Sequence, residues 1–345
     1  MNFDTSVSLK GVNLGGWLVL ERWMTPGFFE GTDAEDEYSF MQTPDAAKKI
    51  EQHRRTFIQE TDFQWLSENG INAVRIPVGY WIFKGDGSYT PCIERLDWAM
   101  KIAEKYSINV LIDLHGAKGS QNGQHHSGKA GKSQWFKDKK YRIQTITTLK
   151  QLAERYHDSP ALWGIELLNE PKFGLFHFTL RKFYKDAQRE LEKVIRPGVA
   201  IVFHDAFTPR LLSGALKDNR NSSVIMDVHW YQFSDIFRKW RSLKQYFSLL
   251  ERRSKLIKSL QKKQPIIVGE WSVTISGDKL QQCNEAEEWR VFEKHGRVQL
   301  ELYAQTAGWF YWTYKTDGRG IWNFRSLIED GHLSLVEQSD ATLVG

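Results

Sequence analysis

Eight short apolar stretches recur along this chain of 345 residues, and segments long enough to form helices separate them. Each stretch is bounded by turn-forming residues and has the length of a buried strand. The predicted strands are Val12–Leu18, Ala73–Val78, Val110–His115, Trp163–Glu170, Ala200–His204, Val224–Trp230, Ile266–Trp271 and Gly308–Tyr314. The predicted helices are His53–Asn69, Ile93–Tyr106, Tyr141–Tyr156, Leu175–Val194, Trp240–Gln261 and Glu285–Thr306. Because strands that alternate with helices form a parallel sheet, and eight of them close it, we expect a single (β/α)8 TIM barrel.

The chain shows no Gly/Ser/Pro-rich linker, low-complexity tract or internal repeat, so we expect residues 1–345 to form one domain. Four of the predicted strands are followed by long connections, at Glu21 to Ile50, Gly116 to Lys140, Ser272 to Glu285 and Lys315 to Asp330. In barrels, such βα loops line the C-terminal face, where active sites lie. Long loops of a compact domain are usually functional. Long loops around the mouth of the barrel are expected to form a pocket, which receives the end of a sugar chain, rather than an open groove.

The charge and hydropathy of the chain exclude some partner classes. With 47 Lys and Arg against 42 Asp and Glu, the net charge is +5, which does not by itself call for a nucleic-acid partner. Basic residues gather between Arg238 and Lys263, where a solvated helix face is the simpler interpretation and an anionic partner the alternative. No apolar run approaches the ~20 residues that a membrane span needs.

The two cysteines, Cys92 and Cys283, cannot build a disulfide framework, and neither has a metal-ligand spacing. The segment Met1 to Lys10 lacks the apolar stretch of a secretion signal. We therefore expect a cytoplasmic monomer from the sequence as written, and a secreted protein if a signal segment has been removed.

Two glutamates close predicted strands on the catalytic rim of the barrel. Glu170 ends the fourth strand and Glu270 ends the seventh. A retaining glycosidase needs one carboxylic acid to protonate the leaving oxygen and one carboxylate to attack the anomeric carbon, about 5–5.5 Å apart. A glutamate that closes an apolar strand fits a solvated surface charge poorly, because burying an unpaired charge is costly. In this interpretation the pKa of Glu170 must be raised and that of Glu270 lowered.

Other polar residues end strands in the same way. Glu166 shares the fourth strand with Glu170 but lies closer to the barrel floor, so we expect a buried structural role for it. Further rim candidates are Arg75, Asp113, His115, Asn169, His229 and Tyr231. An arginine beside the nucleophile would keep it ionised, and an amide could donate to the sugar 2-hydroxyl. A structural ion pair or a satisfied core hydrogen bond is the alternative for each residue taken alone.

Several ordered motifs resemble glycoside hydrolase family 5, in the branch of the fungal exo-β-1,3-glucanases. They run in sequence as Lys10–Glu21, Val74–Trp81, Ile112–Gly123, Gly164–Pro171, Val268–Ser272 and Gly308–Lys315. The resemblance covers residues from about 9 to about 333. It implies a (β/α)8 fold, Glu170 as acid/base and Glu270 as nucleophile, without a metal or cofactor. It also implies a glycone subsite lined by Arg75, His115, Asn169, His229, Tyr231 and Trp312, with Glu21 contacting sugar hydroxyls.

The chain departs from the fungal pattern in two respects. Those enzymes are secreted and disulfide-bonded, whereas Cys92 and Cys283 stand alone here. Where they place an aromatic residue after Ser-Gln-Asn-Gly, this chain has Gln124 followed by His125 and His126. The aromatic clamp around the leaving sugar is therefore altered, and Phe233 is expected to supply its remaining half.

From these observations we expect a retaining, exo-acting hydrolase of β-1,3-glucan or its oligosaccharides. Within the same class, a β-1,6-linked glucan or a glucosylated lipid is the alternative substrate. A non-catalytic carbohydrate-binding barrel and a metal-dependent hydrolase that uses Asp113, His115 and His229 are the alternatives from other classes.

Overall fold

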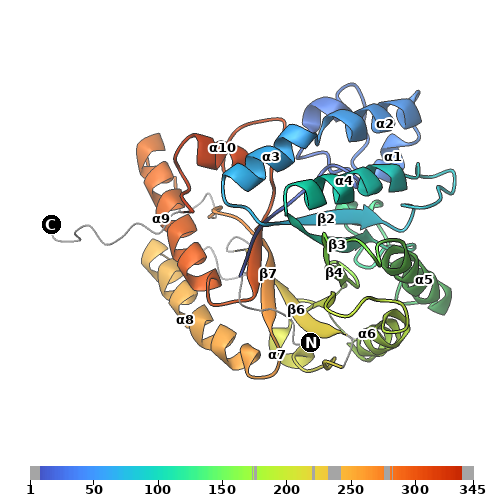
Figure 1. Ribbon diagram of the computed structural model, residues 1–345. Coiled ribbons are helices and arrows are strands. Elements are labelled where there is room, and N and C mark those ends of the chain that lie inside the picture. The colour runs from blue at the N-terminus through green and yellow to red at the C-terminus, as the bar shows by residue number, and fades with distance from the viewer. Residues whose placement is uncertain are drawn as a thin grey trace.

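Eight parallel strands close into a barrel in the computed structural model, which describes residues 8–172, 174, 177–219, 222–231, 242–275, 280–281 and 283–335. Each strand pairs with the next along the chain, and the last pairs with the first (Figure 1). The strands are β1 (Leu9–Asn13), β2 (Ala73–Gly79), β3 (Asn109–Gly116), β4 (Leu162–Glu166), β5 (Ala200–His204), β6 (Ser223–His229), β7 (Ile266–Trp271) and β8 (Gly308–Tyr311). The predicted (β/α)8 barrel is confirmed.

Helices surround the barrel and bury the outer face of its strands (Figure 1). They are α3 (Glu60–Glu68), α4 (Ile93–Lys105), α5 (Lys139–Arg155), α6 (His177–Leu191), α7 (Pro209–Leu212), α8 (Leu243–Gln261), α9 (Glu285–Tyr303) and α10 (Phe324–Glu329). Short elements in the loops are η1 (Pro26–Phe29), α1 (Glu37–Phe40), α2 (Ala46–Thr56) and η2 (His125–Ser127). Within the described ranges, no helix combines the length and apolar character that crossing a membrane requires.

Three predicted strand ends were wrong near the mouth of the barrel. The eighth strand was predicted to reach Tyr314, but β8 ends at Tyr311. The first strand was predicted at Val12–Leu18, but β1 ends at Asn13 because the chain turns outward at Gly15 and Gly16, where Gly16 has a φ of +67°. The fourth was predicted to reach Glu170, but β4 ends at Glu166. Glu170 therefore stands beyond the strand, with a φ of +38° that few non-glycine residues adopt.

One predicted helix is two helices. The segment His53–Asn69 is interrupted between α2 and α3, because the backbone N–H of Gln59 donates to Asp62 Oδ2 at 2.8 Å and so begins a new helix. The remaining predicted helices coincide with α4, α5, α6, α8 and α9 to within a few residues.

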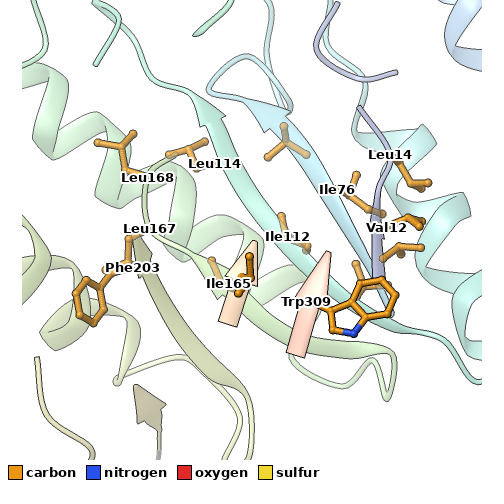
Figure 2. Close-up of a cluster of buried hydrophobic side chains, with 14 of the residues drawn as sticks. Val12, Leu14, Ile76, Ile112, Leu114, Ile165, Leu167, Leu168, Phe203 and Trp309 are labelled. Carbon is orange, nitrogen blue, oxygen red and sulfur yellow. The ribbon is translucent and has the colours of Figure 1, made fainter. Parts of the chain in front are cut away.

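The outer face of the strands forms the main hydrophobic core. Figure 2 shows Ile76, Ile112, Leu114 and Ile165 from β2, β3 and β4 in this layer, with Trp309 of β8. These residues are buried because a parallel barrel is covered by helices on its outside.

The inner face of the strands changes in character from floor to mouth. A separate apolar cluster fills the floor and comprises Leu9, Ala73, Leu111, Ala200, Val202, Ile225, Ile267 and Phe310. Because side chains two residues apart share a face, the strand that places Leu111 on the floor places Asp113 and then His115 above it. The same alternation puts Arg75 of β2 directly above Ala73. The charged residues of the barrel thus lie between an apolar floor and the loops.

Gly269 in β7 is required by the close approach of Asp227 in β6. Its backbone N–H donates to Asp227 Oδ1 at 2.6 Å. A Cβ atom at Gly269 would lie 1.9 Å from Asp227 Oδ2, so no other residue fits without displacing that carboxylate.

We expect Gly269→Ala to lower the free energy of unfolding by about 1–3 kcal/mol, because it overpacks the barrel interior. Denaturant unfolding would measure the loss. The control Gly318→Ala introduces a Cβ with nothing within 4 Å and should change stability by less than about 0.5 kcal/mol. Equal effects of the two substitutions would contradict this account of Gly269.

Candidate active site

A buried arginine joins the strands at the level just below the mouth. Arg75 donates from Nε to Glu166 Oε2 at 2.8 Å and from Nη1 to Asn13 Oδ1 at 2.9 Å. Nη1 also reaches Glu270 Oε1 at 3.1 Å, and Nη2 donates to Asn169 Oδ1 at 2.9 Å. Arg75 is 0% exposed. Each N–H of its planar guanidinium therefore faces an oxygen atom of a neighbouring side chain.

Further carboxylates complete the surroundings of Arg75. Asp113 Oδ2 lies 3.1 Å from Nη2, and Asp227 Oδ2 lies 3.9 Å from Nε. Burial disfavours a charged guanidinium, but the carboxylates of Asp113, Glu166 and Glu270 outweigh it and hold the pKa of Arg75 well above its ordinary value. Glu166 is fully buried, and burial raises its pKa well above the usual range despite the pairing with Arg75. This position fits the structural role expected for Glu166.

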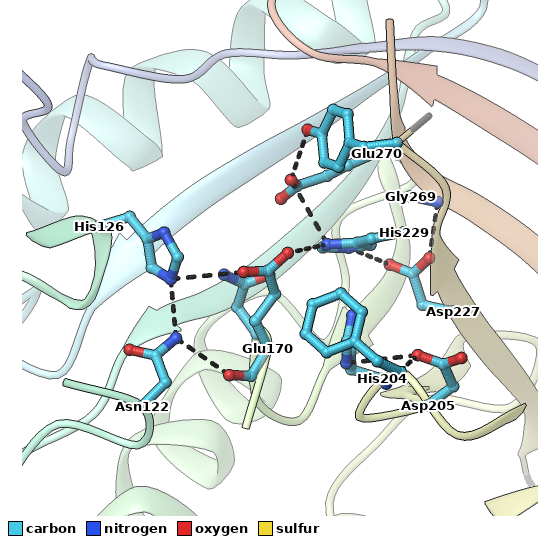
Figure 3. Close-up of polar contacts among 12 residues, drawn as sticks. Asn122, His126, Glu170, His204, Asp205, Asp227, His229, Gly269 and Glu270 are labelled. Carbon is cyan, nitrogen blue, oxygen red and sulfur yellow. Dashed lines mark hydrogen bonds and ion pairs between the residues drawn. The ribbon is translucent and has the colours of Figure 1, made fainter. Parts of the chain in front are cut away.

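His229 connects the two predicted catalytic glutamates. Its Nδ1 lies 2.7 Å from Glu170 Oε1 and 3.4 Å from Glu270 Oε2, while Nε2 lies 3.4 Å from Asp227 Oδ2 (Figure 3). Strand register explains the meeting, because His229 of β6 pairs with Glu270 of β7. Burial lowers the pKa of His229, but these carboxylates, Glu270 first, outweigh it and raise that pKa well above 6.5. The imidazole thus lies among three carboxylates that favour its protonated form.

The pKa order of the two glutamates is the reverse of the one expected from the sequence. Burial raises the pKa of Glu170, but the hydrogen bond and charge of His229 outweigh it, so the net shift is downward. Burial raises the pKa of Glu270 to about 7; repulsion by Glu170 adds to the rise and His229 opposes it. The physical reason is distance, since His229 Nδ1 lies closer to Glu170 than to Glu270.

Tyr231 fixes the orientation of Glu270. Its hydroxyl donates to Glu270 Oε2 at 2.8 Å, while Arg75 occupies Oε1 at 3.1 Å. With both oxygens held, the carboxylate is presented in one orientation, as a nucleophile requires.

His115 and Trp312 form one flat side of the site. Their rings are stacked with centroids 5.5 Å apart and planes 8° apart. His115 Nδ1 lies 2.6 Å from Asp113 Oδ2, and its Nε2 lies 3.3 Å from Asn169 Nδ2. Since Asn169 Oδ1 accepts from Arg75, its amide N–H faces His115, which makes Nε2 the acceptor. The hydrogen bonds thus determine the orientation of both side chains.

Glu21 lies at the entrance, on the loop that follows β1. Its Oε2 accepts from Trp23 Nε1 at 2.8 Å and lies 3.5 Å from His125 Nε2. Burial raises the pKa of Glu21, but the hydrogen bond from His125 and the charges of His126, His115 and His125 outweigh it, so the net shift is downward. Phe233, the other predicted entrance residue, lies outside the described residues.

The entrance loops are hydrogen-bonded to each other. The backbone N–H of Ala130 donates to Asp36 Oδ2 at 2.6 Å, and that of Tyr38 donates to the Gly128 carbonyl at 3.0 Å. On the other side, the N–H of Gly27 donates to Asp317 Oδ2 at 2.9 Å. The loop after β1 therefore joins the loops after β3 and β8 into one wall.

Sequence reasoning missed three buried residues of this site: Asn13, His204 and Asp227. Asn13 Nδ2 donates to the Gly269 carbonyl at 2.8 Å. The ring of His204 contacts that of His229 edge-on, with centroids 4.3 Å apart. A signal for Asp227 was present, because it precedes His229 by two residues and so shares its face of the strand.

Among the described residues, two groups have ligand-type atoms within 4.8 Å of one another: Glu170, His204 and His229, and Glu166, Asp227 and His229. Both groups depend on His229, whose two nitrogens already lie in ion pairs with carboxylates. The set considered from the sequence, Asp113, His115 and His229, is not one of these groups. Ion pairs with His229 account for the closeness of the side chains in both groups.

We expect Arg75→Met to lower the free energy of unfolding by about 3–5 kcal/mol, because it leaves buried carboxylates without their cation. Denaturant unfolding would measure this. The control Arg55→Met removes an exposed ion pair with Glu51 and should cost less than about 1 kcal/mol. A loss at Arg75 no larger than that at Arg55 would show that the carboxylates do not depend on the guanidinium.

Comparison with known proteins gives this geometry a context. The chain is 31% identical over 374 residues to a protein of Aspergillus niger named probable glucan 1,3-beta-glucosidase A, with 95% of this chain and 88% of that protein covered. It is 33% identical to the protein of the same name from Neosartorya fischeri, over the same shares of both chains.

A solved structure shares the fold. The crystal structure of rutinosidase from Aspergillus niger superposes with a TM-score of 0.82 at 22% identity, covering 96% of this chain and 99% of that one. Residues 37–318 match the family model described as cellulase, glycosyl hydrolase family 5. The chain therefore belongs to glycosyl hydrolase family 5.

Proposed function

We propose that this glycoside hydrolase is a retaining, exo-acting β-glucosidase of β-1,3-glucan or its oligosaccharides, with Glu170 as acid/base and Glu270 as nucleophile. The observation that carries the proposal is the sharing of His229 Nδ1 by the two carboxylates, at 2.7 and 3.4 Å. One oxygen of each carboxylate lies within 3.4 Å of the same nitrogen, which supports a retaining pair, whose carboxyl groups stand about 5–5.5 Å apart.

In the first step, Glu270 attacks the anomeric carbon as a carboxylate while Glu170 gives its proton to the glycosidic oxygen. The proton that the free pair favours on Glu270 must therefore lie on Glu170 once substrate is bound. The bond to the leaving group breaks, the alcohol departs, and a glycosyl ester forms on Glu270. In the second step, the Glu170 carboxylate takes a proton from water, whose oxygen attacks the same carbon. The ester bond breaks, the sugar leaves with its original configuration, and Glu170 is again protonated.

One feature supports attack on chain ends, and another supports the β-1,3 linkage. The loops after β1, β3 and β8 are joined by hydrogen bonds into one wall beside the catalytic residues. Relatives with 31% and 33% identity carry the name probable glucan 1,3-beta-glucosidase A, which supports the β-1,3 linkage. A β-1,6-linked glucan or a glucosylated lipid is the alternative, since Gln124 stands where the fungal enzymes place an aromatic residue.

A non-catalytic sugar-binding barrel is a weaker alternative. Such a barrel has no need for Glu270 to be held at both oxygens by Arg75 and Tyr231, nor for His229 to lie between two glutamates. Hydrolysis of an aryl β-glucoside by the intact chain decides between the two.

We expect Glu270→Ala to reduce kcat on an aryl β-glucoside by more than about 10³-fold, because the glycosyl ester cannot form. Azide should restore part of the turnover by attacking from the vacated side, giving an α-glucosyl azide. NMR of the product identifies the anomer. Turnover like that of the wild type in this variant would refute the assignment of Glu270.

On β-1,3-linked glucose oligosaccharides, we expect glucose as the main product, released first as the β-anomer. The same chain should cleave β-1,3 disaccharides with a higher kcat/KM than β-1,4 or β-1,6 disaccharides or glucosylated lipids. Chromatography and NMR of the early products measure both points. A mixture of longer oligosaccharides would contradict the exo mode, and a preference for another substrate in the panel would reassign the aglycone.

A further inference from the structure

The loop after β3 brings an imidazole to Glu21 at the entrance. His125, in η2, places its Nε2 3.5 Å from Glu21 Oε2. His125 belongs to the Gln124–His126 segment, where the chain departs from the fungal pattern. The mechanism above gives this residue no role.

The two carboxylate oxygens of Glu21 have different surroundings. Oε2 accepts from Trp23 Nε1 at 2.8 Å and faces His125. Among the described residues, none donates a hydrogen bond to Oε1, and this atom remains accessible to solvent. Glu21 as a whole is only 3% exposed. A nearly buried carboxylate therefore keeps one oxygen open for a donor that the described protein does not supply.

This open oxygen belongs to a side chain that lies beside the catalytic residues. The charge of Glu21 acts on His115 and on Tyr231, whose hydroxyl holds Glu270. The ring of Trp322 contacts both that of Tyr231 and that of Trp23, the residue that donates to Glu21. A glucoside that reaches Glu270 brings hydroxyl donors of the kind that Oε1 lacks.

A carboxylate buried to this extent needs a positive charge nearby to stay ionised. In the part of the chain that the structure describes, His125 is the one cationic side chain in ion-pair contact with Glu21. The contact with Glu21 raises the pKa of His125 against the opposing effect of burial. Burial lowers the pKa of the neighbouring His126, so that ring is less able to carry the charge.

We propose that His125 is a positioning residue that keeps Glu21 ionised, with Oε1 free to accept a hydrogen bond from a hydroxyl of the bound sugar. The inference rests on the proposed function and extends it from the catalytic pair to sugar recognition at the entrance. Glu21 is the group that binds, and His125 acts through it. Sugar affinity then depends on a charge that lies outside the catalytic pair.

Other titratable groups face the two side chains. They are Asp36 and Glu35 around His125, and His115, His126 and Tyr231 around Glu21. Asp36 already accepts the backbone N–H groups of Ser39 and Ala130, at 2.7 and 2.6 Å. No backbone N–H of the described residues donates to the Glu21 carboxylate. Glu21 is therefore the carboxylate that depends on the imidazole.

The test measures binding rather than hydrolysis. Its probe is phenyl 1-thio-β-glucoside, a neutral analogue in which sulfur replaces the glycosidic oxygen that is protonated during hydrolysis. Titration followed by NMR gives Kd at pH 5 and at pH 8. The variants are His125→Gln, which removes the cation, and His125→Lys, which retains one. The control His157→Gln removes an exposed imidazole just beyond α5.

Without the cation, burial raises the pKa of Glu21, so its carboxylate is lost as the pH falls. For His125→Gln we expect Kd to rise about fivefold to tenfold at pH 5 and less than about twofold at pH 8, because a charged acceptor forms the stronger hydrogen bond. His125→Lys and His157→Gln should stay within about twofold of the wild type at both pH values.

An unchanged Kd in His125→Gln at pH 5 would overturn the inference, and so would an equal rise at both pH values, because lost packing has no such pH dependence. In a Glu21→Gln background, His125→Gln should add less than about twofold. A further fivefold loss there would show that His125 acts without Glu21. Failure of the proposed function is recognised separately, since the wild-type chain would then not hydrolyse phenyl β-glucoside.

Discussion

The ion pairs of Arg75 are the interaction on which the site depends. One guanidinium, fully buried, reaches oxygens from β1, β4 and β7 and lies beside two further carboxylates from β3 and β6. Buried charges of one sign are tolerated only where a cation neutralises them. The strand ends therefore carry a cluster of acids that the apolar floor below them could not accommodate. Glu270 acquires its orientation from this cluster, and through His229 the cluster is connected to Glu170.

Much of this arrangement follows from alternation along the strands. The positions of Arg75 on β2 and of Asp113 and His115 on β3 follow from a period of two, which places them on the inner face near the strand ends. The polar rim could therefore be predicted, together with the barrel that carries it. Asn13 could not, because a single polar residue within an apolar run has no distinguishing pattern. The end of β1 could not be predicted either, because Trp17 and Leu18 are as apolar as buried strand residues although they lie beyond the turn at Gly16.

The protonation states depend on details that the sequence does not contain. The pKa order of Glu170 and Glu270 is determined by a difference of less than an ångström in their distances to His229. The tautomer of His115 depends on the amide of Asn169, whose oxygen accepts from Arg75 and whose N–H therefore faces the ring. Motifs identify which groups can exchange protons. Where the protons lie is decided by hydrogen bonds between loops that are distant in sequence.

The hydrogen bonds between the loops after β1 and β3 have a consequence for engineering. Tyr38 and Asp36 in one loop bond to Gly128 and Ala130 in the other, and the ammonium of Lys129 lies 3.5 Å from the centre of the Tyr38 ring. A graft that replaced residues 124–130 with a segment of different backbone path would break these contacts and take the backbone N–H of residue 130 away from Asp36 Oδ2. The two loops constitute a single unit of exchange, so altered aglycone preference is best sought by transplanting them together.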